Sequence, residues 1–364
     1  MANIDDLIID GYYIKDVSHI GDENLASFSL KSSMISYFQT AEDLTNLLKR
    51  SDLQTMTDQE VNKACGPKYA IDACDAITHL QHFLELYIKD ILMEDSPLFV
   101  YDASNKPDIL YDLIHGKDIT DKRLEKVYFI EFSEAIDRLK AIIDRIDSKY
   151  GFLEKHFGMM KSLNHLRNRI AHRGAFVIRY KALDELFCKY VIPLIDEIKQ
   201  NTPEYTKPLE WGFNLHTKID VYAELKNEYL KPTVNPKRVY LLKLIANCAY
   251  NNEIPYFEPV PKTENPVDAI FNMHTDYSWI YDERKTIIAK RALGEAEQRF
   301  GRVEKCPICG CESFVLENDY YDTDEACVPY VYDASCHHCG FHLDGDLLNP
   351  TDFGLPLPDY SQMV

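Results

Sequence analysis

The chain has 364 residues, 46% of them hydrophobic, and its 59 Asp and Glu residues outnumber its 40 Lys and Arg residues to give a net charge of −19. This length suits two or three domains, each with a core of its own. So acidic a composition excludes a protein that coats nucleic acid through a broad basic surface, although it leaves room for a small basic site.

The N-terminal sequence MANIDDLIIDGYYIKD lacks the basic segment and the apolar core of a signal peptide. No stretch approaches the roughly 18 consecutive apolar residues of a transmembrane helix, so we expect no membrane partner. Most of the ten cysteines follow residue 300, where they form Cys-x-x-Cys pairs that indicate metal binding rather than disulfides. These features predict a cytoplasmic protein with reduced thiols.

Residues 1–64 are predicted to be a partly helical N-terminal segment with a short helix at 41–50. A longer helix is predicted over 68–92, because apolar residues recur there at steps of three and four. Its predicted apolar stripe comprises Ile71, Cys74, Ile77, Leu80, Leu84, Ile88 and Ile91. Pro97 cannot continue a helix and should end this one.

Three further amphipathic helices are predicted, at residues 122–147, 152–173 and 181–200. The predicted buried stripe of the middle one comprises Phe157, Met160, Leu163, Leu166 and Ile170. Gly174 is a suitable C-terminal stop for it, and Pro193 should kink the last helix or divide it in two. Helices with short links and no alternating strands predict a mainly α fold, with an antiparallel helical bundle over residues 65–200.

Residues 201–300, punctuated by prolines, are predicted to be a connector with helices at 237–250 and 277–300. The connector shows no pattern that indicates a chemistry of its own. Residues 301–350 have the pattern of a small β domain, and residues 351–364 are expected to be a C-terminal tail.

Two cysteine pairs, CPICG at 306–310 and CHHCG at 336–340, flank SFVLEND and VPYVYDAS, which alternate enough to form the strands of a hairpin. Two such pairs can wrap a tetrahedral Zn²⁺, and the layout is that of a zinc ribbon. The predicted ligands are Cys306, Cys309, Cys336 and Cys339. Four cysteine ligands leave no open coordination position, so the zinc is expected to be structural.

Cys311 and Cys327 lie outside this set, and either they substitute for a ligand or they stay unpaired thiols. His337, His338 and His342 are expected to decorate the second cysteine pair. The acidic sequence ENDYYDTDEA in the hairpin disfavours a nucleic-acid clamp. The acidic hairpin is more compatible with a surface that binds a protein partner, mediates self-association or acts as a sensor.

The stretch SLNHLRNRIAHRGAF at 162–176 is unusually basic for this chain. Between residues 155 and 181 there are seven Lys or Arg, three His and no Asp or Glu. On a helix, one polar flank would carry Lys161, His165, Asn168, Arg169 and His172. Arg167 lies about 140° from His172 around the helix, since five residues separate them, but its long side chain can bend towards the same spot. These residues predict a local anion site.

Such a site suits the cleavage of a phosphodiester. His172 can move protons near neutral pH, and Arg167 can hold a phosphate with two donors while it stabilises the charge that builds on the oxygens. Asn168 can orient the imidazole or a sugar hydroxyl. No cluster of carboxylates lies nearby in the sequence, so we expect catalysis without a metal cofactor. RNA is the expected substrate, because its 2′-hydroxyl can serve as the nucleophile.

The sequence RNRIAH at 167–172 resembles the Arg-polar-x(3)-His motif of HEPN domains, which are nucleotide-binding helical bundles. The upstream sequence AITHLQHFLELYIKDIL is similar to the first HEPN helix, with Glu85 and Lys89 at its Glu-x-x-x-Lys position. The simpler interpretation of these two residues is an ion pair on the helix surface. The resemblance covers about residues 65–200.

The resemblance implies a metal-independent endoribonuclease, often a toxin or phage-defence effector, that dimerises so that two motifs form one cleft. It implies proton transfer by His172, phosphate stabilisation by Arg167 and orientation by Asn168, with structured RNA such as tRNA as a candidate substrate. The residues expected to contact the RNA, or else to be solvated, are Arg169, Arg173, Lys161 and His165.

The alternative function is that of a non-catalytic protein in which the bundle and the ribbon bind a partner or a nucleotide. A DNA-binding regulator is disfavoured, because the sequence shows no helix-turn-helix with an exposed basic second helix.

Overall fold

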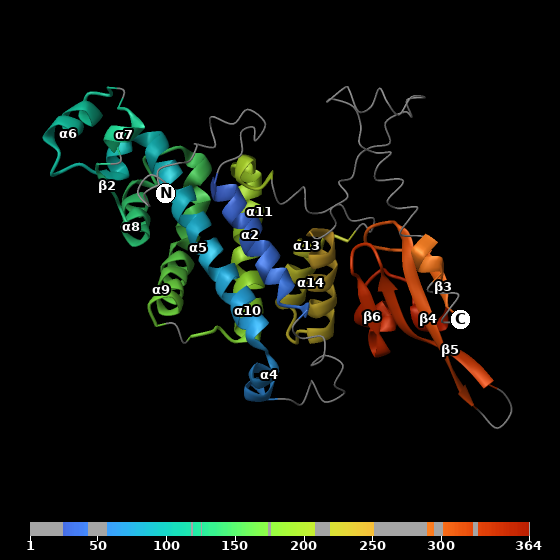
Figure 1. The fold of residues 1–364 in the computed structure, drawn as a ribbon. Helices are drawn as coiled ribbons and strands as arrows, with labels where there is room; N and C mark the ends of the chain where they lie inside the picture. Colours follow the sequence, from blue (N-terminus) through green and yellow to red (C-terminus); the bar gives the residue numbers. More distant parts are fainter. Residues whose placement is uncertain are drawn as a thin grey trace, which may run out of the picture. The chain divides into compact units, whose positions relative to one another are not determined.

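The computed structural model describes residues 25–42, 57–117, 119–124, 126–173, 176–207, 219–250, 290–294, 301–322 and 327–363. The described residues are mostly helical, with a small antiparallel sheet near the C-terminus (Figure 1). The chain forms two compact units, one from residues 1–37 and 67–209 and the other from residues 38–66 and 210–364. Among the described helices, none is both long and apolar enough to cross a membrane.

The longest helix of the first unit is α5, Pro67–Asp95, which confirms the helix predicted at 68–92. Its buried face includes Leu80, Leu84 and Ile88, but Ile71 is 61% exposed, so its place in the predicted stripe was wrong. Nine residues at about 100° each place Ile71 on the opposite side of the helix from Leu80. Each step of three residues falls about 60° short of a full turn, so residues at repeated steps of three move around the helix. The predicted stripe therefore left the buried face at the N-terminal end of α5.

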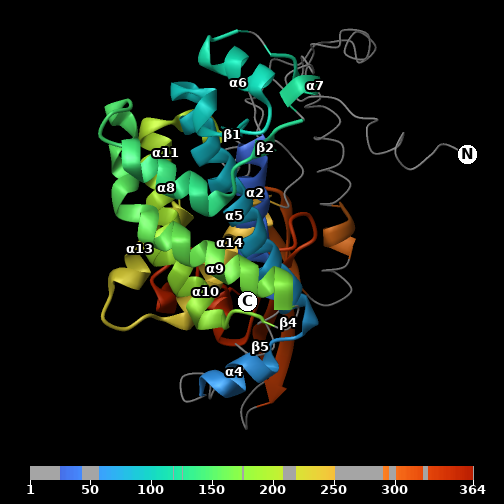
Figure 2. The same ribbon diagram turned by 90° about the vertical axis from the view of Figure 1, so that its left-hand side faces the viewer.

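Two helices, α8 at Phe132–Ile142 and α9 at Phe157–Arg173, pack against α5 and against each other (Figure 1 and Figure 2). The helix predicted at 152–173 is therefore present, but its first turns belong to a 3₁₀ segment, η4, at Ser148–His156. The buried residues of α9 include Phe157, Met160 and Leu163. Leu166 and Ile170 are only half-buried, and Gly174 lies outside the described residues.

The single helix predicted at 122–147 is wrong. The chain instead forms α7 at Asp121–Leu124 and the short strand β2 at Tyr128–Phe129 before α8 begins. β2 pairs with β1, Tyr101–Asp102, and the rings of Tyr101 and Phe129 lie 4.5 Å apart between centroids. Consecutive β-branched and aromatic residues favour a strand over a helix, and this preference prevails here. Between β1 and α7 lies α6, Pro107–Ile114.

The helix predicted at 181–200 is divided, as Pro193 suggested. It consists of α10 at Tyr180–Leu186, a π-helical turn, η5, at Phe187–Val191, and α11 at Ile192–Asn201, followed by η6 at Pro203–Tyr205. The proline stands at the start of α11, where its missing N–H costs no hydrogen bond.

The first unit also contains α2, Leu25–Gln39, a helix within the segment expected to be partly helical. The ring of Tyr37 stacks on Phe187 with centroids 4.1 Å apart, and Ser33 Oγ donates a hydrogen bond of 2.8 Å to the carbonyl of Ala76. The helices around α5 therefore include one that precedes the predicted bundle. Of the short helix predicted at 41–50, residues 43–50 lie outside the described residues.

The described part of the second unit combines helices with a four-stranded antiparallel sheet. Its helices are α4, Asp58–Ala64, α13, Val221–Leu230, and α14, Pro236–Tyr250. Its strands, in the order β3-β4-β5-β6, are Arg302–Lys305, Glu312–Asp322, Cys327–Cys336 and His342–Asp344. The predicted helix at 237–250 and the predicted hairpin are confirmed. Of the helix predicted at 277–300, only 290–294 is described, and it is helical.

The chain after β6 forms three short 3₁₀ segments, η7 at Gly345–Leu348, η8 at Pro350–Phe353 and η9 at Tyr360–Gln362. η7 and η9 pack against the sheet, and η8 packs against α14. Tyr360 lies edge-on to Phe314 of β4 with centroids 5.0 Å apart, and both rings are buried. Arg238 of α14 donates a hydrogen bond of 2.6 Å to the carbonyl of Phe353. The residues expected to be a tail therefore belong to the core of this unit.

The orientation of α5 can be tested by two alanine variants. Leu84 is fully buried, so Leu84→Ala leaves a cavity and should lower the free energy of unfolding by about 2–5 kcal/mol. Ile71→Ala removes an exposed aliphatic side chain from the same helix and should change it by less than about 0.5 kcal/mol. Urea denaturation followed by circular dichroism compares the two, and equal losses would contradict the orientation.

Candidate functional site

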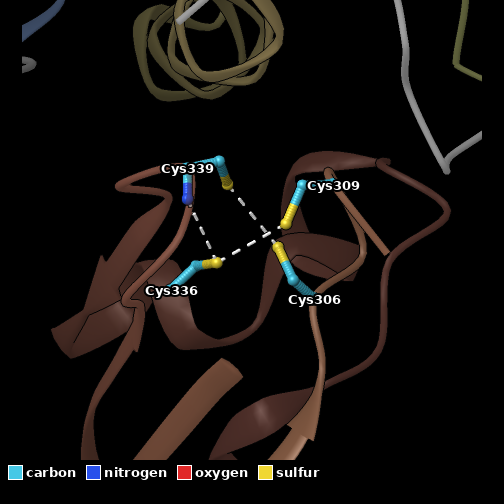
Figure 3. A group of neighbouring side chains, drawn as sticks. All are labelled: Cys306, Cys309, Cys336 and Cys339. Atoms are coloured by element: carbon cyan, nitrogen blue, oxygen red, sulfur yellow. Dashed lines mark hydrogen bonds between the residues drawn. The ribbon is translucent and has the colours of Figure 1, made fainter. Parts of the chain in front are cut away.

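The four cysteines predicted as ligands converge from two loops of the sheet (Figure 3). The two loops have the same backbone design. Cys306 N–H donates to the carbonyl of Cys311 at 2.8 Å, and Cys336 N–H donates to the carbonyl of Phe341 at 2.7 Å. In each loop the glycine after the second cysteine has a positive φ, 72° at Gly310 and 75° at Gly340, which only glycine adopts at little cost. The CxxCG pattern therefore produces two matching turns.

The sulfur atoms of this four-cysteine cluster are spaced for a shared ion. Sγ of Cys306 lies 3.7 Å from Sγ of Cys339, and Sγ of Cys309 lies 3.6 Å from Sγ of Cys336. Disulfide sulfurs would be about 2 Å apart. Four sulfurs at tetrahedral corners about 2.3 Å from a metal ion would be roughly 3.8 Å apart, which matches the observed spacing. The cluster can therefore hold one metal ion.

The surroundings of Cys336 favour its thiolate form. The backbone N–H groups of Ile308 and His338 each lie 3.4 Å from the Sγ of the first cysteine in their loop. Hydrogen bonds from Cys306, and then from Cys309 and Cys339, hold the pKa of the Cys336 thiol below its usual value. A metal ion binds the thiolate form, so a lowered thiol pKa assists binding.

Other potential ligands adjoin the cluster. The thiol of Cys248, on α14, hydrogen-bonds Cys339 and is the main cause of a raised pKa at that cysteine. Cys311 is buried beside Cys309 and His338, with ligand atoms within 4.8 Å of one another, whereas Cys327 is exposed at the start of β5. Cys311 is therefore the better placed of the two to substitute for a ligand.

The basic flank of α9 is partly engaged with neighbouring residues. Lys161 pairs with Asp137 of α8 at 2.5 Å, although both side chains are largely exposed. The guanidinium of Arg169 lies over the ring of Phe176, 3.8 Å from its centroid. His165 is exposed, and nothing is described of the side chain of Arg173. Residues 155–181 contain no carboxylate themselves, but the fold brings Asp137 of α8 next to Lys161. The basic stretch is therefore not free of carboxylates in the folded chain.

Arg167 is the most buried cation of the predicted motif. Its Nη1 donates to Oδ1 of Asn168 at 3.2 Å, so the predicted neighbours do interact. Its Nε is buried and has no hydrogen-bond partner among the residues that the structure describes. His172 is exposed near the end of α9. Within the described part of the chain, no hydrogen bond links Arg167 to His172.

A polar face of α5 adds a residue that sequence analysis missed. His82, Glu85 and Lys89 lie at steps of three and four and share this face. Lys89 pairs with Glu85 at 2.6 Å, and His82 Nδ1 lies 2.9 Å from Ser29 Oγ. Burial lowers the pKa of His82, while Glu85 raises it and several cations, Arg167 among them, lower it further. The sequence signal was the spacing of His82 from the Glu-x-x-x-Lys pair.

The structure thus brings together the four predicted cysteine ligands and joins Arg167 to Asn168, but it spreads the other predicted contacts over the exposed side of α9. Comparisons of this chain with protein-family models, with curated proteins and with solved structures found no match.

The lowered pKa of His82 makes stability depend on pH. Below about pH 6.5 the unfolded chain binds a proton at this histidine while the folded chain resists it, so stability falls as the pH falls through that value. His82→Gln should make the free energy of unfolding less sensitive to pH between about 7.5 and 5.5, as measured by urea denaturation. His165→Gln removes an exposed imidazole as a control. A pH dependence unchanged by His82→Gln would contradict the assignment.

Proposed function

We propose that this chain is a metal-independent endoribonuclease whose first unit is a HEPN-like bundle, acting as a homodimer with one composite site. The observation that carries the proposal is the buried Nε of Arg167, which lacks a hydrogen-bond partner among the described residues. A buried donor without a partner costs about 1–3 kcal/mol, and more when it is charged. A phosphate oxygen is the acceptor that a guanidinium suits best, so this donor supports an anion site.

His172 supplies the proton chemistry in this proposal. Its exposure leaves the imidazole accessible to a large substrate, and an imidazole can accept or donate a proton near neutral pH. Since Arg167 and His172 lie about 140° apart on one helix, a single copy does not direct both at one phosphate. A second copy that places its own α9 against the first would combine Arg167 of one chain with His172 of the other.

The proposed reaction needs no group beyond these side chains and the RNA. One imidazole takes the proton of the 2′-hydroxyl as the 2′-oxygen bonds to phosphorus, and Arg167 stabilises the negative charge on the non-bridging oxygens. The imidazolium formed in this way gives its proton to the departing 5′-oxygen. The products are a 2′,3′-cyclic phosphate and a 5′-hydroxyl.

The remaining cations of α9 would guide the RNA. Lys161 is paired with Asp137 on the surface, and such exposed pairs contribute little to stability, so Lys161 can turn to a phosphate at small cost. His165 and Arg169 lie on the same exposed side of the helix. A role as a toxin or phage-defence effector, with tRNA among the substrates, is proposed on the family resemblance alone.

A second candidate function is nucleotide or partner binding without catalysis. The observation that favours it is that Arg167 and Asn168 form their pair without His172. An anion site of this kind can bind a nucleotide phosphate even where no imidazole reaches it.

For the second unit we propose that the four-cysteine cluster binds a structural Zn²⁺ and makes the sheet a zinc ribbon. Thiolates select Zn²⁺ among the common divalent ions with tetrahedral geometry, and four of them leave no position for a substrate. The observed sulfur spacing of 3.6 to 3.7 Å fits that ion.

The nuclease proposal predicts large losses of RNA cleavage in Arg167→Ala and in His172→Ala, each of about a hundredfold or more. His115→Ala removes an exposed imidazole of α6's C-terminal end and should cleave as the parent does. Cleavage is measured on purified protein with EDTA present and the product ends are identified by mass spectrometry. Parent protein that binds RNA or nucleotide but never cleaves would favour the second candidate function.

The composite site is tested separately by mixing the two inactive variants. A heterodimer of Arg167→Ala and His172→Ala chains retains one complete pair, so it should recover a substantial part of the parent's activity. A site built within one chain would give no recovery, which would contradict the dimeric arrangement while leaving the nuclease proposal intact.

The zinc proposal predicts one Zn²⁺ per chain, measured by metal analysis of the purified protein. Cys336→Ser should lose the ion and expose the C-terminal unit to limited proteolysis, because metal binding supplies much of the folding energy of such small domains. Cys327→Ser changes an exposed cysteine outside the cluster and should keep the ion. Full zinc content in Cys336→Ser would contradict the proposed ligand set.

A further inference from the structure

A second group of ligand-type side chains lies on the two C-terminal strands, apart from the four cysteines. Asp333 of β5 and His342 and Asp344 of β6 each place one ligand atom within 4.8 Å of the others. Asp333 pairs directly with Asp344 in the antiparallel ladder, and His342 pairs with Ser335. Directly paired residues share a face, so these three side chains share one face of the sheet, whereas Ala334 and Leu343 are buried on the other.

The Asp–His–Asp group brings two carboxylates and one imidazole close together. Carboxylates at directly paired positions of neighbouring strands repel each other. His342 Nε2 lies 2.5 Å from Asp333 and can offset one charge when it is protonated, but two carboxylates and one imidazolium still leave a net negative charge. A divalent cation balances both carboxylates while the imidazole stays neutral and offers a lone pair.

The backbone also departs from regular pairing at this point. The register between β4 and β5 shifts between Glu317 and Asn318, so that β5 carries an extra residue, Tyr332, immediately before Asp333. Such bulges re-aim the side chains beside them. Asp344 stands at the N-cap position of η7 yet makes no capping hydrogen bond to that segment.

We propose that Asp333, His342 and Asp344 bind a divalent transition-metal ion at a site separate from the four-cysteine cluster. One imidazole and two carboxylates are ligands of borderline and hard character, which suit Mn²⁺, Fe²⁺, Co²⁺ or Zn²⁺, while the imidazole disfavours Mg²⁺ and Ca²⁺. Three protein ligands leave positions open for water or for a group on a partner molecule. The proposal is independent of the nuclease proposal, because this site lies in the second unit.

The probe is Mn²⁺, which binds nitrogen and oxygen ligands and competes poorly for thiolates. Full-length protein that already carries one equivalent of Zn²⁺ is titrated with Mn²⁺ at about pH 7.5, and free Mn²⁺ is followed by its electron paramagnetic resonance signal. We expect one Mn²⁺ per chain. Asp344→Asn and His342→Ala should weaken its binding about tenfold or more. Asp352→Asn removes an exposed carboxylate of η8, with the same change in charge as Asp344→Asn, and should bind as the parent does.

Two further measurements make the result decisive. Retention of the first Zn²⁺ equivalent and an unchanged circular dichroism spectrum show that a variant is folded. Lowering the pH to about 5.5 should release the Mn²⁺, since protonation removes the lone pair of His342. Equal binding by the parent and Asp344→Asn would overturn the proposal. So would displacement of Mn²⁺ by an equal concentration of Mg²⁺, because that behaviour belongs to a general acidic surface.

Discussion

The packing of α9 against α5 is the constraint on which the candidate site depends. It buries the apolar side of α9 and with it the Nε of Arg167, two positions before an arginine that stays on the outside. The same packing leaves His172 exposed. A single helix thus holds Arg167 and His172 apart, and under the proposed function this separation would give a second copy of the chain a chemical role.

Periodicity predicted the elements whose fold is decided locally. α5 and α14 lie where the sequence predicted helices, and the two cysteine loops are encoded within five residues each, since a glycine with positive φ completes each turn. Periodicity did not predict the elements that depend on contacts between residues distant in the sequence. The pairing of β2 with β1 replaced a predicted helix, and α2 was not recognised as a bundle helix, because what buries it lies far away in sequence.

The two candidate metal sites differ in the same way. The four-cysteine cluster could be predicted because each half is a short motif with its own hydrogen bonds. The Asp–His–Asp group depends on the register of β5 against β6 and on an extra residue in β5, neither of which the sequence reveals. His342 was accordingly assigned, from the sequence, to the surroundings of the second cysteine pair, with no role of its own. His82 escaped notice for a related reason, since its contacts with Ser29 and Arg167 come from other helices.

The net charge of −19 limits what the proposed RNA site can be. A chain this acidic repels a long polyanion over most of its surface, so attraction has to be confined to a few phosphates. A buried guanidinium donor can provide such a local attraction, because salt screens its interaction with a phosphate less than it screens a surface contact. In the proposed dimer, specificity would come from fitting one phosphodiester between two copies of α9 rather than from affinity along the RNA strand. In the proposed nuclease, the acidic surface would thus repel most of the RNA while the cationic helix α9 would bind the phosphates at the cleavage site.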